Sequence, residues 1–242
     1  MGSPARTTPT ALSVVSSAAS LQAPAIRLRG YGKPEQMQIE SVSVTPPAPN
    51  EVRIRQTAIG VNYFDVYLRK GWIPEFLPLP GTPGMEAAGE VMDVGAEVTS
   101  LLPGDRVVYM CPVPGSYATV RNVPVSCTTR IPPDVRDEVA AALLLKGVTA
   151  DYLLRDLGHI QAGTRLLIHA AAGGVGQLLS AWASSVGALV AAAFFTATGL
   201  TAAVLAAAFF AATFLAAGLV VAALRAAVVL PAAFLGLTAS AS

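Results

Sequence analysis

The sequence predicts an α/β protein with a β-rich part first, an incomplete parallel βαβ domain second and an apolar helical tail last. Three observations predict this order. Short segments of alternating apolar and polar residues, separated by Gly and Pro, fill residues 25–120. A strand, a glycine-rich turn and a helix are indicated at residues 165–187. From residue 191 onward the chain is an almost uncharged run of Ala, Leu, Phe, Val and Thr.

Residues 1–24 have a composition of their own. They are rich in Ser, Thr and Ala, carry one charged side chain (Arg6), and precede the first acidic residue, Glu35. Organelle transit peptides avoid acidic residues and favour hydroxyls, so a transit peptide is one interpretation. A disordered N-terminal extension is the other. The expected compartment is the cytoplasm or the matrix of a mitochondrion or plastid.

Period-two patterns predict several short strands after residue 25. Gly and Pro mark the turns between them, and many short strands with such turns are typical of a small barrel or sandwich. The predicted strands lie at residues 26–29, 37–44, 51–58, 86–94, 102–109 (a turn leading into a strand) and 115–120.

The first helical pattern begins after the Pro132–Pro133 pair. Residues 138–145 are rich in Ala and Leu, which favours a helix. Lys146 and Gly147 are expected to interrupt this helix, and residues 149–157 to continue helically toward Gly158. The β-rich part is therefore expected to lead through helices into the glycine-rich unit.

Residues 165–176 read Arg-Leu-Leu-Ile-His-Ala-Ala-Ala-Gly-Gly-Val-Gly. The apolar run at 166–168 predicts a strand buried on both faces of a parallel sheet, and Gly187 suits the end of the following helix. Ala171-x-Gly173-x-x-Gly176 matches the G-x-G-x-x-G fingerprint except for Ala in the first place. Such a turn lets main-chain amides at a helix N-terminus hold a diphosphate. By itself the pattern fits an ordinary glycine-rich turn equally well.

Composition excludes several functional classes. A net charge of +1 provides no field that would favour nucleic acid as a partner. Cys111 and Cys127 are the only cysteines, too few for a disulfide framework or a four-cysteine zinc site. A reducing compartment is therefore expected.

The motifs, in this order, resemble the medium-chain dehydrogenase/reductase superfamily, and within it the zinc-independent quinone oxidoreductase (zeta-crystallin-like) branch. The resemblance runs from Ala25 to Val190. The residues that carry it are Val61-Asn-Tyr-Phe-Asp65, Tyr67, Gly71, Pro83-Gly-Met-Glu-Ala-Ala-Gly89, Val94-Gly95, Gly104-Asp-Arg-Val107, Gly115-Ser-Tyr-Ala118, Lys146-Gly-Val-Thr149 and His169-Ala-Ala-Ala-Gly-Gly-Val-Gly176.

The resemblance implies an alcohol dehydrogenase-like architecture, with a GroES-like barrel domain, an incomplete Rossmann domain and NADP(H) in the cleft between them. The expected segments are an extension or transit peptide at 1–24, the barrel with its linking helix at 25–146, the first part of the NADP(H)-binding domain at 147–190, and the apolar tail at 191–242.

Site residues are also carried over from the family. The expected cofactor-binding residues are Asn62, Asp65, Lys146, Thr149, Gly173, Gly174, Val175 and Gly176; the expected catalytic residues are Asn62 and Tyr67. Each has a structural alternative. Asn62 and Asp65 could satisfy backbone groups in a turn, Tyr67 could be a core aromatic, and Lys146 could be a solvated lysine near a helix end. Glu86 is interpreted as a structural buried carboxylate.

No metal is expected. Zinc-dependent members of the superfamily place a Cys and a His where this sequence has Asn62 and Met85, and neither an amide nor a thioether replaces thiolate and imidazole on zinc.

The implied reaction is transfer of a hydride from NADPH to a small quinone or another conjugated acceptor such as an enone. Asn62 and Tyr67 would polarise the oxygen that gains charge. The sequence after residue 190 offers neither an acid for a ribose hydroxyl nor a basic cluster for a 2′-phosphate. Only the cofactor preference of the resembled family therefore favours NADPH over NADH.

The resemblance stops after Val190, inside a βαβ unit. Residues 187–224 carry no charge over more than the ~20 residues that a membrane-spanning helix needs, so membrane contact through residues 191–242 is one interpretation. A shifted reading frame is the favoured one. The expected consequences are weak cofactor binding and an open oligomeric state. The alternative function is a non-catalytic remnant, or a membrane-anchored protein, that keeps only the barrel domain.

Overall fold

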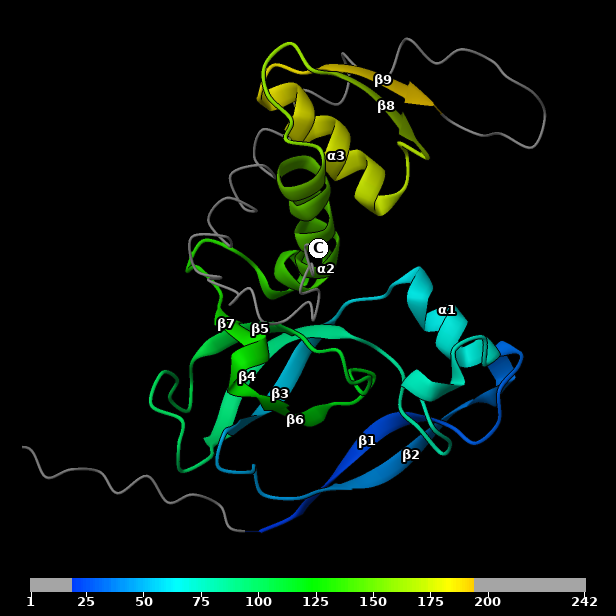
Figure 1. The fold of residues 1–242 in the computed structure, drawn as a ribbon. Coiled ribbons are helices and arrows are strands. Elements are labelled where there is room, and N and C mark those ends of the chain that lie inside the picture. Colours follow the sequence, from blue (N-terminus) through cyan, green and yellow to red (C-terminus); the bar gives the residue numbers. More distant parts are fainter. Residues whose placement is uncertain (1–18, 194–242) are drawn as a thin grey trace, which may run out of the picture.

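The computed structural model describes residues 19–193. Its fold is mixed α/β, with a β-rich body, a small unit of two parallel strands and one helix, and a long helix, α2, between them (Figure 1). The expected tail falls mostly outside the described residues; its first three residues, 191–193, belong to the last strand.

Two antiparallel sheets form the β-rich body. The first pairs β1 (Leu21–Leu28) with β2 (Met37–Val44), so that β1 begins inside the segment expected as an extension. The second has the strand order β6-β3-β4-β5-β7. Its strands are β3 (Glu51–Ile59), β4 (Glu86–Val94), β5 (Arg106–Met110), β6 (Val120–Pro124) and β7 (Thr128–Arg130).

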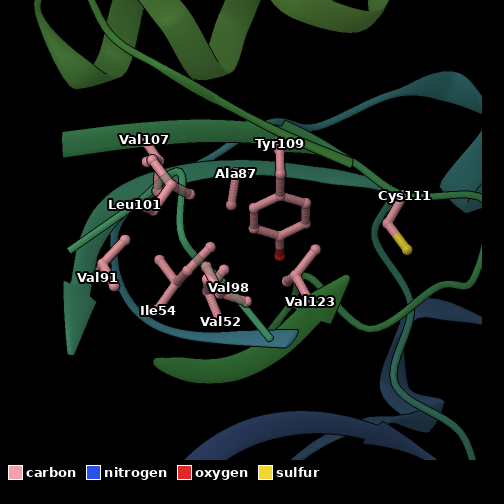
Figure 2. Close-up of a cluster of buried hydrophobic side chains, with 10 residues drawn as sticks. All are labelled: Val52, Ile54, Ala87, Val91, Val98, Leu101, Val107, Tyr109, Cys111 and Val123. Atoms are coloured by element: carbon pink, nitrogen blue, oxygen red, sulfur yellow. The ribbon is translucent and has the colours of Figure 1, made fainter. Parts of the chain in front are cut away.

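The core of this body is built by side chains that alternate along β3, β4, β5 and β6. Figure 2 shows Val52, Ile54, Val91 and Val107 pointing toward one another, with Tyr109 beside them. The Tyr109 hydroxyl donates to Gln56 Oε1 at 2.5 Å and lies 3.0 Å from Ser116 Oγ. The cluster contains four fully buried valines and Ile54, whose burial supplies hydrophobic free energy that holds the strands together.

The prediction of a strand at residues 115–120 is wrong. The N–H groups of Ser116 and Tyr117 donate to the loop carbonyls of Gly84 and Pro83, so they are not available to a strand ladder. Only an isolated bridge from Ala25 to Ala118 remains, and the strand β6 starts at residue 120.

Short helices lie between the strands. Helix α1 (Tyr63–Lys70) begins at Asn62 and ends at Gly71, which has a φ of +70°. Glycine adopts this left-handed conformation without the steric cost that a side chain would add. Three 3₁₀ turns complete the body: η1 (Pro34–Gln36), η2 (Pro74–Phe76) and η3 (Val125–Cys127).

Helix α2 (Asp137–Asp151) runs without a break through Lys146 and Gly147, so the predicted interruption is wrong. A glycine inside a helix costs about 1 kcal/mol relative to alanine. Burial of Gly147 against neighbouring elements outweighs this cost. A π-helical segment, η4 (Tyr152–Leu157), continues the helix.

The last unit consists of β8 (Arg165–His169), α3 (Gly174–Ser185) and β9 (Leu189–Ala193), with β8 and β9 parallel. Helix α3 is followed by Gly187 at a φ of +84°, as the sequence predicts. The expectation that β8 is buried on both faces is wrong for the described residues, because Leu167 is 63% exposed. Leu166 packs in the cluster beneath α3, whereas the opposite face of β8 has no covering layer within residues 19–193.

Candidate functional site

The N-terminus of α1 is fixed by a buried carboxylate. Asp65 Oδ2 accepts the backbone N–H of Asn62 at 2.9 Å and the hydroxyl of Tyr117 at 2.8 Å. Burial raises the pKa of Asp65, and the hydrogen bonds from Asn62 and Tyr117 partly offset this rise. In this structure Asp65 therefore stabilises the start of the helix, which is the structural alternative considered for it.

The Asn62 side chain is buried and points away from its own helix cap. Its Nδ2 donates to Glu86 Oε1 at 2.8 Å, and its Oδ1 accepts a hydrogen bond from Lys146 Nζ at 2.9 Å. The amide thus joins a strand of the barrel to helix α2. One of the two Nδ2 hydrogens remains for another acceptor.

Lys146 connects the barrel to the glycine-rich turn. Its ammonium lies 3.4 Å from the Val61 carbonyl oxygen and 3.7 Å from Glu86 Oε1. Its aliphatic stem lies against Gly174, where an added Cβ would come within 2.8 Å of the lysine Cδ. The side chain is 22% exposed. The lysine is therefore held between the start of α1 and the start of α3, rather than extended into solvent.

The turn between β8 and α3 presents main-chain donors. Gly173 N–H donates to Ala170 O at 2.8 Å, and the helical ladder begins with Gln177 N–H to Gly173 O at 2.9 Å. The amides of residues 174–176 are the first-turn donors, which an α-helix cannot satisfy itself. Gly173 and Gly174 are exposed, so an anion can approach these amides.

Gly176 makes the turn tight. A Cβ at this position would lie 2.3 Å from Ala170 O and 2.7 Å from Ala171 Cα. Ala170 itself has a φ of +53°, a left-handed conformation that costs an L-residue about 1–2 kcal/mol. Such local strain is frequent at ligand sites.

Aromatic side chains gather on α1 and the turn that follows it. Tyr67 stacks on Trp72 with centroids 5.1 Å apart and meets the edge of Tyr63 at 5.3 Å. Trp72 is 60% exposed. Tyr67 is partly buried, and among the described residues its hydroxyl forms no hydrogen bond.

The structure thus brings together three of the sequence-predicted site residues, Asn62, Lys146 and Gly174, through direct contacts. Asp65 is connected to this group through its hydrogen bond from the backbone N–H of Asn62. Thr149 lies one helical turn beyond Lys146, and its hydroxyl donates to Leu145 O at 2.8 Å. No contact joins Tyr67 to this group in the described residues.

Sequence reasoning gave Glu86 only a structural role, although it is a direct neighbour of both Asn62 and Lys146. The signal was present in the sequence. A carboxylate inside the apolar segment Pro83–Gly89 requires buried partners, and the sequence offers Asn62 and Lys146 as polar candidates.

The two positions that would hold zinc ligands have other surroundings. Met85 packs with Leu28, Leu68 and Leu77, and Asn62 bonds to Glu86 and Lys146. Within the described residues, no three His, Cys, Asp or Glu side chains gather as metal ligands would.

Burial of Glu86 leads to a pH prediction. Desolvation raises its pKa above 4.5, while hydrogen bonds from Asn62 and Leu145 and the charge of Lys146 act against this rise. The Glu86 carboxyl therefore binds its proton more tightly in the folded chain than in the unfolded chain. The resulting stability is fully present below about pH 4.5 and is lost as the pH rises through the folded pKa.

Glu86→Gln removes this titration. We expect the free energy of unfolding of the wild type, minus that of the variant, to fall as the pH rises. Urea denaturation of both proteins between about pH 4.5 and pH 8 measures the difference. A difference that stays constant with pH would contradict the assignment.

A family model described as the alcohol dehydrogenase GroES-like domain matches residues 48–156. The crystal structure of Escherichia coli quinone oxidoreductase complexed with NADPH superposes with a TM-score of 0.70 at 38% identity, over 79% of this chain and 56% of that one. The chain belongs to the quinone oxidoreductase branch of the medium-chain dehydrogenase/reductase superfamily.

Curated members of this superfamily are similar over the same region. Quinone oxidoreductase from Pseudomonas aeruginosa is 41% identical over 165 residues, which are 67% of this chain and 50% of that protein. A 2-haloacrylate reductase from Burkholderia is 43% identical over 66% of this chain and 49% of its own length. The chain spans about half the length of the curated relatives it matches.

Two expectations are confirmed by these matches. The superfamily and its quinone oxidoreductase branch are those that the motifs resembled, and the fold is a GroES-like domain followed by a short βαβ segment.

Among residues 19–193, no helix combines the length and the apolar character that crossing a bilayer requires.

Proposed function

We propose that the chain carries the nicotinamide and diphosphate side of a zinc-independent, NADPH-dependent quinone or enone reductase site. The observation that carries this proposal is the position of Lys146. It bonds to Asn62 at the barrel and lies against Gly174 at the glycine-rich turn, so it links the two parts of the proposed site. The proposed domains are the barrel at 25–146 and the first part of the cofactor domain at 147–190.

The residues present fit a dinucleotide diphosphate. Gly174, Val175 and Gly176 offer the first-turn amides that the helix leaves unbonded, Gly173 before them is exposed, and the adjacent Lys146 ammonium adds a positive charge. Asn62 and Thr149 would border the nicotinamide end, and Asp65 would hold Asn62 in place through the start of α1. E. coli quinone oxidoreductase and a mycobacterial relative, 36% identical with a TM-score of 0.68, were both solved with NADPH, which supports this cofactor class.

NADPH, when bound, would supply a hydride from its nicotinamide ring. The protein would align the acceptor and stabilise the oxygen that gains charge. The second Nδ2 hydrogen of Asn62 and the Tyr67 hydroxyl are the proposed donors to that oxygen. The stacked Tyr67 and Trp72 rings offer an apolar surface for a planar conjugated acceptor.

The acceptor class is proposed as a quinone or an activated alkene. Relatives named quinone oxidoreductase and 2-haloacrylate reductase share this region of sequence, and both names describe reduction of a conjugated system. Reduction of a quinone needs no strong general acid at the site, because solvent can protonate the product phenolate.

A second candidate is a non-catalytic protein that retains the barrel. The observation that favours it is the exposure of Leu167 and Leu189 on β8 and β9, which leaves one face of the small parallel sheet uncovered within residues 19–193. Cofactor binding by the chain distinguishes the two candidates.

Titration of the whole chain with NADPH, followed by the fluorescence of the reduced nicotinamide, tests the reductase proposal. We expect binding weaker than micromolar, because the described residues hold no group for the adenosine ribose. Lys146→Met should weaken it a further ~10-fold, about 1.4 kcal/mol, through loss of a charge-assisted contact.

Lys33→Met is the matched control, because Lys33 is exposed and forms no contact with Asn62, Lys146 or Gly174 in the described residues. It should leave the affinity unchanged. If the wild type does not bind NADPH, or if the two variants behave alike, the reductase proposal fails and the non-catalytic candidate takes its place.

A further inference from the structure

Glu86 is a fully buried carboxylate to which the proposed hydride transfer gives no role. It opens β4 and is 0% exposed. A Cβ on Gly60, at the end of β3, would lie 2.3 Å from its Cγ, so only glycine leaves space for the glutamate there. A buried ionised group of this kind is costly unless its charge and its oxygens are satisfied.

Both carboxylate oxygens have donors, and each donor comes from a different helix. Oε1 accepts the Asn62 Nδ2–H at 2.8 Å, at the start of α1. Oε2 accepts the Leu145 backbone N–H at 2.7 Å, on α2. Glu86 therefore joins the barrel sheet to the start of α1 and to α2.

These bonds set the orientation of the Asn62 amide. Because Nδ2 is directed at the carboxylate, Oδ1 is directed at Lys146, whose ammonium donates to it at 2.9 Å. The same ammonium lies 3.7 Å from Glu86 Oε1. A reversed amide would place Nδ2 against the ammonium and Oδ1 against the carboxylate, two unfavourable contacts.

The ammonium in turn lies beside the glycine-rich turn, since the Lys146 stem contacts Gly174. The contacts therefore run from Glu86 through Asn62 and Lys146 to the first turn of α3. In the first two links one polar group fixes the place of the next, and in the last the lysine stem packs on Gly174.

We propose that Glu86 is a positioning residue that holds the Asn62 amide and the Lys146 ammonium in place at the mouth of the glycine-rich turn. Its charge, and not only its shape, is required. The benefit to a bound dinucleotide rests on the proposed function, but the hold on Lys146 is a property of the chain alone.

The test compares Glu86→Gln with Glu90→Gln in the whole chain. Glu90 lies on the same strand, and its ion pair with Arg55 is exposed. The proteins react briefly with an acetyl-transferring N-hydroxysuccinimide ester at about pH 8, and mass spectrometry measures acetylation of each lysine. The sequence has three lysines, so Lys33 and Lys70 serve as internal standards.

The Lys146 amine is tied to Asn62 by a hydrogen bond and is only 22% exposed, so an acylating reagent reaches it less often than a free lysine. We expect Glu86→Gln to release this side chain and raise the acetylation rate of Lys146 several-fold relative to Lys33 and Lys70, and Glu90→Gln to leave it unchanged. Equal rates at Lys146 in the two folded variants would overturn the proposal, whether or not the chain binds NADPH.

NADPH affinity provides the second readout. In a cycle of Glu86→Gln, Lys146→Met and the double variant, a positioning role predicts that the glutamine substitution weakens binding only while Lys146 is present. Equal losses in both backgrounds would assign Glu86 to general stability and overturn the proposal. If the wild type binds no NADPH while acetylation of Lys146 rises as expected, the reductase function fails and the hold of Glu86 on Lys146 stands.

A thermal melt checks that each variant folds. Should Glu86→Gln fail to fold, Asn62→Ala tests the same contacts from the other side, because it removes the amide that Glu86 orients. Acetylation of Lys146 should again rise several-fold in this variant, because the acceptor that holds its ammonium is gone. An unchanged rate would overturn the proposal.

Discussion

Gly176→Ala should destabilise the strand–turn–helix unit by about 2 kcal/mol and abolish NADPH binding. The added Cβ would lie 2.3 Å from Ala170 O and 2.7 Å from Ala171 Cα, both of them backbone atoms. Overpacking of this kind costs up to about 3 kcal/mol, and the higher helix propensity of alanine returns about 1 kcal/mol. Relief would require Ala170 to move, which would break its hydrogen bond from Gly173 N–H.

Urea denaturation followed by the fluorescence of Trp182, which lies on α3, measures the effect in a Trp72→Phe background. Gly173→Ala is the matched control. Its Cβ would meet only Ala170 O, at 3.1 Å, and the residue is exposed, so a much smaller loss is expected. Equal stability of the wild type and Gly176→Ala would refute the tight-turn interpretation.

Arg53→Met should lower the free energy of unfolding by about 3–5 kcal/mol, because it leaves a buried carboxylate without its partner. Arg53 and Asp93 face each other across β3 and β4, with Nη1 and Oδ2 3.0 Å apart and side-chain exposures of 1% and 12%. Removing one charge leaves the other desolvated and uncompensated.

Arg55→Met is the control for this pair. Arg55 lies on the same strand, and its ion pair with Glu90 has side-chain exposures of 55% and 44%. The expected loss in the free energy of unfolding is therefore less than about 1 kcal/mol. The double variant Arg53→Met/Asp93→Asn should recover part of the loss, since no buried charge remains unpaired. Guanidinium denaturation monitored by circular dichroism distinguishes these outcomes. Similar losses in the two single variants would contradict the argument.

Local sequence patterns predicted most elements, because the residues that decide them are close together in the chain. The glycine-rich turn and the end of α3 at Gly187 depend on the few residues around them. The strands β2 and β3 coincide with segments in which apolar and polar residues alternate, and β4 with an extended segment whose first residues are buried on both faces.

The errors lie where distant partners decide the structure. Residues 115–120 alternate like a strand, yet the carbonyls of Gly84 and Pro83 take the N–H groups of residues 116 and 117. Gly147 is predicted to interrupt α2, yet tertiary burial outweighs its low helix propensity. Leu167 belongs to an apolar run, but within the described residues no layer covers its face of β8.

The sequence by itself determined the family, the barrel-then-βαβ order and the candidates Asn62, Lys146 and Gly173–Gly176, because these are carried by residue types at short spacing. Only the tertiary structure decided that Glu86, Asn62, Lys146 and Gly174 form one connected group. The physical reason is that these residues come from four separate segments of the chain. Their contacts depend on how α2 packs against the barrel sheet and how α3 packs against α2, which no local pattern specifies.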